Sequence, residues 1–224
     1  MNIETEIQEI TKDYKIKNLM SLQDRTNKNC YWPRLGNLRF FSKLREEYGY
    51  HFLYEIQSLS NQIHYGIVQC LLLRDKICTR KGHPNIYNHR YTFMLESSIH
   101  CIYSYWNRVG LALNIYLKEP KNLRNTYFSS VVSQLVKDYP SLEKNHNYLW
   151  ITTVKDALNE LNRNEFAHNN SLIMQSFLDF NSHSSNLEDL LKIPDILLFH
   201  NKFIVDEVFN LVSLLEELDN LEID

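Results

Sequence analysis

The chain has 224 residues, of which 44% are hydrophobic and 23% charged, a composition typical of a globular protein with a substantial core. Five Gly and five Pro exclude collagen-like, linker-rich and broadly disordered chains. The formal net charge of -3 hides a split: residues 1–178 carry 22 Lys and Arg against 16 Asp and Glu (+6), and residues 179–224 carry 2 against 11 (-9). The basic part is compatible with a polyanionic partner, and the acidic part is a candidate for neutralising some of that surface.

The N-terminal region is predicted to be helical and to contain no targeting signal. Residues 1–17 have acidic side chains early and no apolar stretch, so we expect no secretory signal. No apolar run in the chain approaches the roughly 20 residues that span a bilayer, and we expect a cytoplasmic protein without membrane contact. Ile3, Ile7, Ile10 and Tyr14 recur at helical spacing, whereas residues 30–37 predict a bend.

Two long helices are predicted next, over about residues 50–79 and 90–118. The second has apolar residues at alternating steps of four and three, which form one stripe: Leu95, Ile99, Ile102, Trp106, Val109, Leu113 and Tyr116. Glu119 and Pro120 are expected to end it. Because only about ten residues separate the two helices, we expect them to form an antiparallel hairpin.

Shorter helices are predicted over residues 125–138, 144–162 and 194–221, and Pro194 suits the first turn of the last one. The predicted fold class is therefore all-α, an antiparallel helical bundle with an N-terminal helical extension. Residues 1–45 form the extension in this interpretation, and residues 46–224 form the bundle as one compact unit.

Several familiar kinds of chemistry have no motif in the sequence. There is no glycine-rich phosphate loop, no Gly-x-Ser-x-Gly turn and no His-Glu-x-x-His. Cys70, Cys78, His83 and His89 can be considered as a metal-ligand set, but their spacing does not fit a zinc site and Cys70 lies on an apolar stripe. We therefore expect neither a metal nor a cofactor.

A polar cluster follows the apolar Leu158 and Leu161 at the end of the helix predicted for residues 144–162. In it, Arg163 is followed directly by Asn164 and, five positions after the arginine, by His168. A continuing helix would bring the guanidinium and the imidazole within about one and a half turns of each other. The alternative is a helix C-terminus in which polar side chains satisfy the last carbonyl groups.

This pattern resembles the HEPN superfamily of small helical-bundle proteins. The hallmark of the family is an Arg, four to six residues and then a His, with Asn, Asp or His commonly next to the Arg. Arg163, Asn164 and His168 fit these conditions, and the order of two long antiparallel helices followed by shorter ones is similar over roughly residues 50–218. Arg45 and His51 also have the spacing, but Glu46 follows the arginine, so this second pair lacks the typical neighbour.

The resemblance implies a metal-independent endoribonuclease of the toxin or antiviral-defence kind. It also implies a homodimer in which two motifs form one composite site, with an antitoxin as a candidate partner. The residue types suit this chemistry, because the imidazole of a histidine can move protons and an arginine offers a permanent bidentate cation to a phosphate; these would be His168 and Arg163. Asn164 would orient the phosphate or the imidazole, and attack by the 2′-hydroxyl would give a 2′,3′-cyclic phosphate.

Further residues are candidates for supporting roles. Glu96, Asn107 and Arg108 lie off the apolar stripe of the helix predicted for residues 90–118, where a solvated face is the alternative. A basic cluster at the hairpin tip is a candidate RNA contact, with a solvated tip as the alternative: Arg74, Lys76, Arg80, Lys81 and Arg90. Arg108 is counted among the candidate RNA contacts as well.

Two other functions stay open. One is a non-catalytic HEPN-like protein that binds RNA or a nucleotide. The other is a helical protein-interaction module whose acidic last helix packs on a partner or on the basic part of its own chain.

Overall fold

The computed structural model of the chain describes residues 3–23, 30–80, 82–161, 172–173, 177 and 187–221. Every regular element in these ranges is a helix, which confirms the predicted all-α class. The α-helices are α1 (Ile3–Asp13), α2 (Tyr31–Gly36), α3 (Arg39–Tyr48), α4 (Phe52–Arg74), α5 (Ile86–Asn114), α6 (Phe128–Asp138), α7 (His146–Glu160), α9 (Leu187–Ile204) and α10 (Val208–Asn220). Short 3-10 turns cover Leu19–Leu22, Leu123–Asn125 and Pro140–Lys144.

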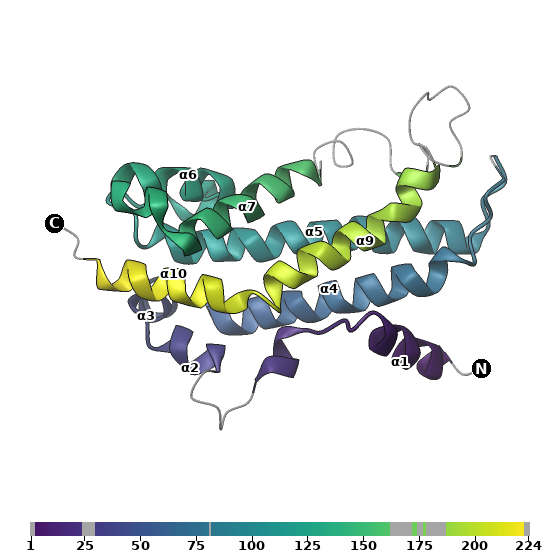
Figure 1. Cartoon of the computed structure of the whole chain (residues 1–224), viewed down its shortest axis with the longest axis horizontal. Coiled ribbons are helices and arrows are strands. Elements are labelled where there is room, and N and C mark those ends of the chain that lie inside the picture. The colour runs from purple at the N-terminus through teal and green to yellow at the C-terminus, as the bar shows by residue number, and fades with distance from the viewer. Residues whose placement is uncertain are drawn as a thin grey trace.

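The antiparallel pair α4 and α5 runs along the length of the molecule, and the other helices pack around it (Figure 1). The two helices share the most extensive contact between any two described elements. Gly66 allows this close approach, because a Cβ atom there would collide with Ser98 Oγ. The predicted hairpin is therefore confirmed, and its facing apolar side chains form the centre of the core.

The ends of α5 differ from the prediction for reasons that lie in asparagine side chains. The helix begins at Ile86 rather than near Arg90, because Asn85 accepts hydrogen bonds from the first backbone N–H groups and Asn88 Oδ1 accepts one from Asn85 N, 2.9 Å away. It ends at Asn114 rather than at Lys118. There the Asn114 side chain bonds both the N–H and the C=O of Lys121, at 2.9 and 2.8 Å, and holds the returning chain.

The predicted helix over residues 194–221 is wrong in its start and in its continuity. The structure has two helices, α9 and α10, which meet at a bend over residues 205–207. Pro194 lies buried inside α9 rather than in its first turn. A proline cannot donate to the carbonyl four residues earlier, and the Tyr91 hydroxyl of α5 donates to that carbonyl, Leu190 O, at 3.1 Å instead.

The N-terminal residues are helical and contribute to the same core as the hairpin. Residues 30–37 contain the short helix α2 rather than only a bend, and Pro33 lies in its first turn, where no backbone N–H is needed. Leu19, Tyr31 and Phe40 are completely buried in one apolar cluster with the side chains of α4 and α5. The boundary at residue 45 stays a prediction.

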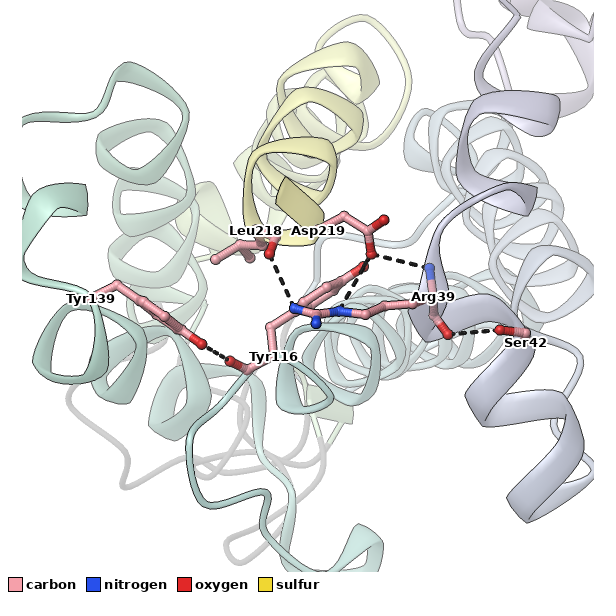
Figure 2. A network of polar contacts seen from close by, with 6 residues as sticks. All are labelled: Arg39, Ser42, Tyr116, Tyr139, Leu218 and Asp219. Carbon is pink, nitrogen blue, oxygen red and sulfur yellow. Dashed lines mark hydrogen bonds and ion pairs between the residues drawn. The ribbon is translucent and has the colours of Figure 1, made fainter. Parts of the chain in front are cut away.

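The acidic C-terminal helices pair with basic residues from earlier in the chain. Near the end of α10, Asp219 Oδ1 accepts hydrogen bonds from the Tyr116 hydroxyl at 2.9 Å and from Arg39 N at 3.1 Å, as Figure 2 shows. The Arg39 guanidinium also donates to Leu218 O at 3.3 Å. One turn earlier, Glu216 forms a two-pronged pair with Arg34 at 2.6 and 2.8 Å. At Glu216 and Asp219, negative charges of the acidic C-terminal part are thus paired with arginines from the basic part of the same molecule.

Within the described residues, no helix combines the length and the apolar character that crossing a bilayer requires.

Candidate functional site

Arg163, Asn164 and His168 lie outside the described residues, and so does Lys81. The described residues nearest to the motif are Leu161, which directly follows α7, and Leu172. Both side chains are buried, at 6% and 3% exposure.

The two stretches that flank the motif are both attached to α5. Before it, the Tyr103 hydroxyl donates to Leu158 O at 2.5 Å, in the last turn of α7. After it, Leu172 N donates to Glu96 Oε1 at 2.9 Å. Tyr103 and Glu96 are seven residues apart on α5, which is two turns or about 10 Å along the helix axis. Two hydrogen bonds to one helix thus hold the described residues before and after the motif.

A cleft opens between α7 and α9 close to the last described residues before the motif. It has a volume of ≈ 520 Å³, within the range of small-molecule sites. Its walls are apolar with a few charged groups, from Ala157, Glu160, Lys192, Asp195, Ile196, Phe199 and His200. The cleft therefore lies beside the end of α7.

His200 is the titratable group of this cleft that the fold perturbs most. Its side chain is 1% exposed and lies against the contacting rings of Phe199 and Phe203, whose centroids are 6.0 and 6.1 Å from its own and 4.8 Å from each other. Burial lowers the pKa of His200 to about 4, so the imidazole is neutral at pH 7. Its Nδ1 atom has no hydrogen-bond partner in the described part of the chain.

The three supporting residues proposed on α5 have different surroundings. Glu96 is half-buried and holds the segment after the motif, as described above. Asn107 Oδ1 accepts from Phe128 N at 3.3 Å and so supports the start of α6. Arg108 pairs with Glu55 of α4 at 3.6 Å and lies over the ring of Tyr50. Of the three, Glu96 is the one that the structure brings into contact with the chain next to the motif.

The described members of the predicted RNA-binding cluster have different surroundings. Arg74 donates to the Tyr14 hydroxyl at 3.1 Å and pairs with Asp195 at 3.7 Å, and Lys76 pairs with Glu6 at 3.1 Å. Arg80 and Arg90 are exposed near the hairpin tip. Arg108 is 18 residues from Arg90 on the same helix, about 27 Å along its axis.

The thiol and imidazole set considered for a metal is separated by burial. Cys70 is completely buried in the core, and burial raises the pKa of its thiol to about 12, which opposes the thiolate form that binds metals. Cys78 is half-buried, while His83 and His89 are exposed. No group of three His, Cys, Asp or Glu side chains in the described ranges is arranged to hold a metal ion.

The sequence prediction did not include the α7–α9 cleft. A signal for it existed, because His200 and Asn201 occupy the positions i+3 and i+4 after the buried Leu197, where an amphipathic helix places core residues. Two adjacent polar side chains at core positions indicate a site or a buried hydrogen-bond network.

Comparisons with protein-family models, with characterised proteins and with solved structures find no significant match to this chain.

Proposed function

We propose that this chain is a HEPN-type RNA-binding protein that cleaves RNA without a metal ion, as a homodimer of the toxin or antiviral-defence kind. The observation that carries the proposal is the order Arg163, Asn164 and His168 directly after the amphipathic helix α7. The all-helical architecture with a long antiparallel hairpin is what this family requires.

The attachment of both flanking stretches to α5 supports the proposal. Leu158 and Leu172 are bonded to Tyr103 and Glu96 of the same helix. A catalytic segment needs fixed ends, because reacting groups must be held close to the productive geometry. The cleft between α7 and α9 adds a space of ≈ 520 Å³ beside the end of α7 for part of the substrate.

The proposed chemistry uses the RNA's own 2′-hydroxyl. One imidazole removes the 2′-hydroxyl proton while the oxygen attacks the adjacent phosphorus, and the bond to the 5′-oxygen of the next nucleotide breaks. A second imidazole, His168 of the other protomer, donates a proton to that leaving oxygen. The Arg163 guanidinium stabilises the charge on the phosphorane oxygens, and the product ends in a 2′,3′-cyclic phosphate.

An RNA-cleavage assay with His168→Ala tests the proposal. We expect the wild-type protein to cleave RNA in the presence of EDTA and the variant to lose at least 100-fold in rate, because general acid–base catalysis contributes roughly that much. The matched control is His51→Ala, which removes the histidine of the second Arg–His pair, an exposed residue just before α4. This control should cleave at the wild-type rate.

Two outcomes would contradict catalysis. Equal cleavage by wild type and His168→Ala would show that the activity belongs to a contaminant or to other residues. RNA binding that weakens in Arg163→Ala without any cleavage would favour the non-catalytic binding protein instead.

A further inference from the structure

Helix α1 contributes little of its own surface to the core. In the described ranges it is the one α-helix without a buried residue, and its main neighbour is α4. Ile7 and Ile10 pack partly buried against the core, and Glu6 pairs with Lys76 at 3.1 Å. Figure 1 shows α1 at the edge of the molecule, joined to the other elements by a non-helical stretch. Because an isolated helix of 11 residues is marginal in water, α1 depends on these few contacts.

The contact between α1 and the end of α4 is incompletely packed. A groove of ≈ 270 Å³ lies between them, lined by Glu6, Glu9, Ile10, Asp13, Leu71, Leu72, Asp75 and Lys76. Four of these side chains are acidic and one is basic, so like charges repel each other across the groove. Leu71 and Leu72 are only 6% and 7% exposed. Departure of α1 would uncover their apolar atoms, and the surface of α4 would then need another cover.

The turn that ends α1 holds a lysine in a strained conformation. Ile16 N donates to Thr11 O at 3.0 Å and Lys15 N donates to Lys12 O at 3.2 Å, which are the two hydrogen bonds of a Schellman motif. Glycine usually occupies the left-handed position of this motif, but here Lys15 occupies it with φ 52°. It is the only non-glycine residue with a positive φ among those that the structure describes. An arrangement that straightens this turn would relieve the strain.

The chain is fixed again directly after this turn. Ile16 is 5% exposed, and Leu19 N donates to the Ser60 hydroxyl at 3.0 Å. Movement of α1 as a unit is thereby confined to a hinge of two residues, Tyr14 and Lys15. Short hinges under strain favour the exchange of an identical element between two copies of a chain.

We propose that α1 exchanges between two copies of this chain, so that α1 of one copy covers α4 of the other. The cover is then identical to the one within a single chain, and it regains the pair between Glu6 and Lys76 and the burial of Leu71 and Leu72. Straightening of the turn releases Lys15 from the left-handed region in both copies, which favours the exchanged dimer at high protein concentration. The exchange uses no residue of the motif at Arg163, so it does not depend on the proposed RNA cleavage.

Complementary charge reversals test the exchange. The Glu6→Lys chain brings two cations together at this contact and the Lys76→Glu chain brings two anions together, whereas an exchanged pair with one chain of each kind restores two opposite-charge contacts. In an equimolar mixture with one chain labelled with heavy nitrogen, native mass spectrometry should therefore find more heterodimer than the half that random pairing gives. High salt should return the mixture toward random pairing.

The matched control for this mixture is the pair of Glu188→Lys and Lys192→Glu chains. These two residues pair at 2.9 Å within α9, so exchange of α1 cannot restore their contact, and we expect random pairing. Monomers alone at millimolar protein, or random pairing of the Glu6→Lys and Lys76→Glu chains, would overturn the proposal. A dimer held only through the motif would also pair at random, so this result is distinct from that of the RNA-cleavage test.

Lys15→Gly tests the hinge, and Lys17→Gly is its matched control. Glycine adopts the left-handed conformation without strain, so the closed monomer gains and the Kd of the dimer should rise roughly 25-fold or more, about fivefold for each chain. Lys17 is also exposed but has no positive φ, so Lys17→Gly should leave the Kd unchanged. Analytical ultracentrifugation measures both values. Equal Kd values for Lys15→Gly and the wild type would contradict a strained hinge.

Discussion

His200 is an ionisable side chain that the fold keeps neutral. Burial beside Phe199 and Phe203 lowers its pKa from an ordinary value of 6.5 to about 4. The unfolded chain therefore binds a proton at a higher pH than the folded chain does. Stability from this residue is fully present above pH 6.5 and is lost as the pH falls toward 4.

Between pH 7 and pH 5 this difference amounts to about 2 kcal/mol of unfolding free energy. We expect His200→Leu to remove that part of the pH dependence, since leucine does not titrate and suits an apolar site. Urea unfolding at pH 7 and at pH 5 measures the loss for each protein.

The control for this prediction is His100→Leu, which makes the same change at an exposed position on α5. Its loss of stability between the two pH values should match that of the wild type. A His200→Leu variant that loses as much stability as the wild type would show that other groups cause the acid sensitivity.

At the scale of the helix, Pro194 and Tyr91 form a compensated pair. The proline leaves Leu190 O without its intrahelical donor, and the Tyr91 hydroxyl replaces that donor at 3.1 Å. Leu190 and Tyr91 are both buried, at 3% and 0% exposure, so water cannot take the place of the hydroxyl. The helix α9 can therefore continue through a residue that usually ends one.

Tyr91→Phe should destabilise the protein by about 1–3 kcal/mol, because it leaves a buried carbonyl unpaired. In a Pro194→Ala background the backbone regains an N–H at position 194, so the same substitution should cost about 1 kcal/mol less. A double-mutant cycle by chemical denaturation measures this coupling. Additive effects would contradict the compensation.

The elements that the sequence predicts well are those fixed by local spacing. The alternating stripe from Leu95 to Tyr116 correctly indicated the long helix α5. The bend between α9 and α10 was missed, because Ile204 and Val208 keep a helical spacing across it. The start of α9 before Pro194 was missed for a different reason: the compensating donor, Tyr91, lies 99 residues away from Leu190 in sequence.

At the scale of the whole molecule, a motif and a cavity differ in how far the sequence predicts them. Arg163, Asn164 and His168 are close in sequence, so their pattern is visible without a structure. A cavity of ≈ 460 Å³ lies where Tyr14 and Lys15 meet α9, almost 190 residues later in the chain, and no local pattern indicates it. The contact between Glu96 and the chain after the motif is equally long-range, although Glu96 itself was among the predicted supporting residues.

The N-terminal 45 residues are integrated with the rest of the molecule. Leu19, Tyr31 and Phe40 are completely buried in the common core. Arg34 and Arg39 pair with Glu216 and Asp219 of the last helix. Removal of this segment would therefore expose apolar surface and leave two acidic side chains without their arginine partners.

We expect a fragment of residues 46–224 to lose cooperative unfolding, because fully burying each large apolar side chain contributes roughly 1.5–3 kcal/mol and whole domains are stable by only about 5–15 kcal/mol. Thermal and urea denaturation followed by circular dichroism measures this. The control is the full chain with Arg34→Gln, which removes the pair with Glu216 but keeps the apolar contacts. It should lose only about 1–3 kcal/mol and still unfold cooperatively. A fragment that unfolds in one sharp transition with the stability of the full chain would instead establish residue 45 as a true boundary.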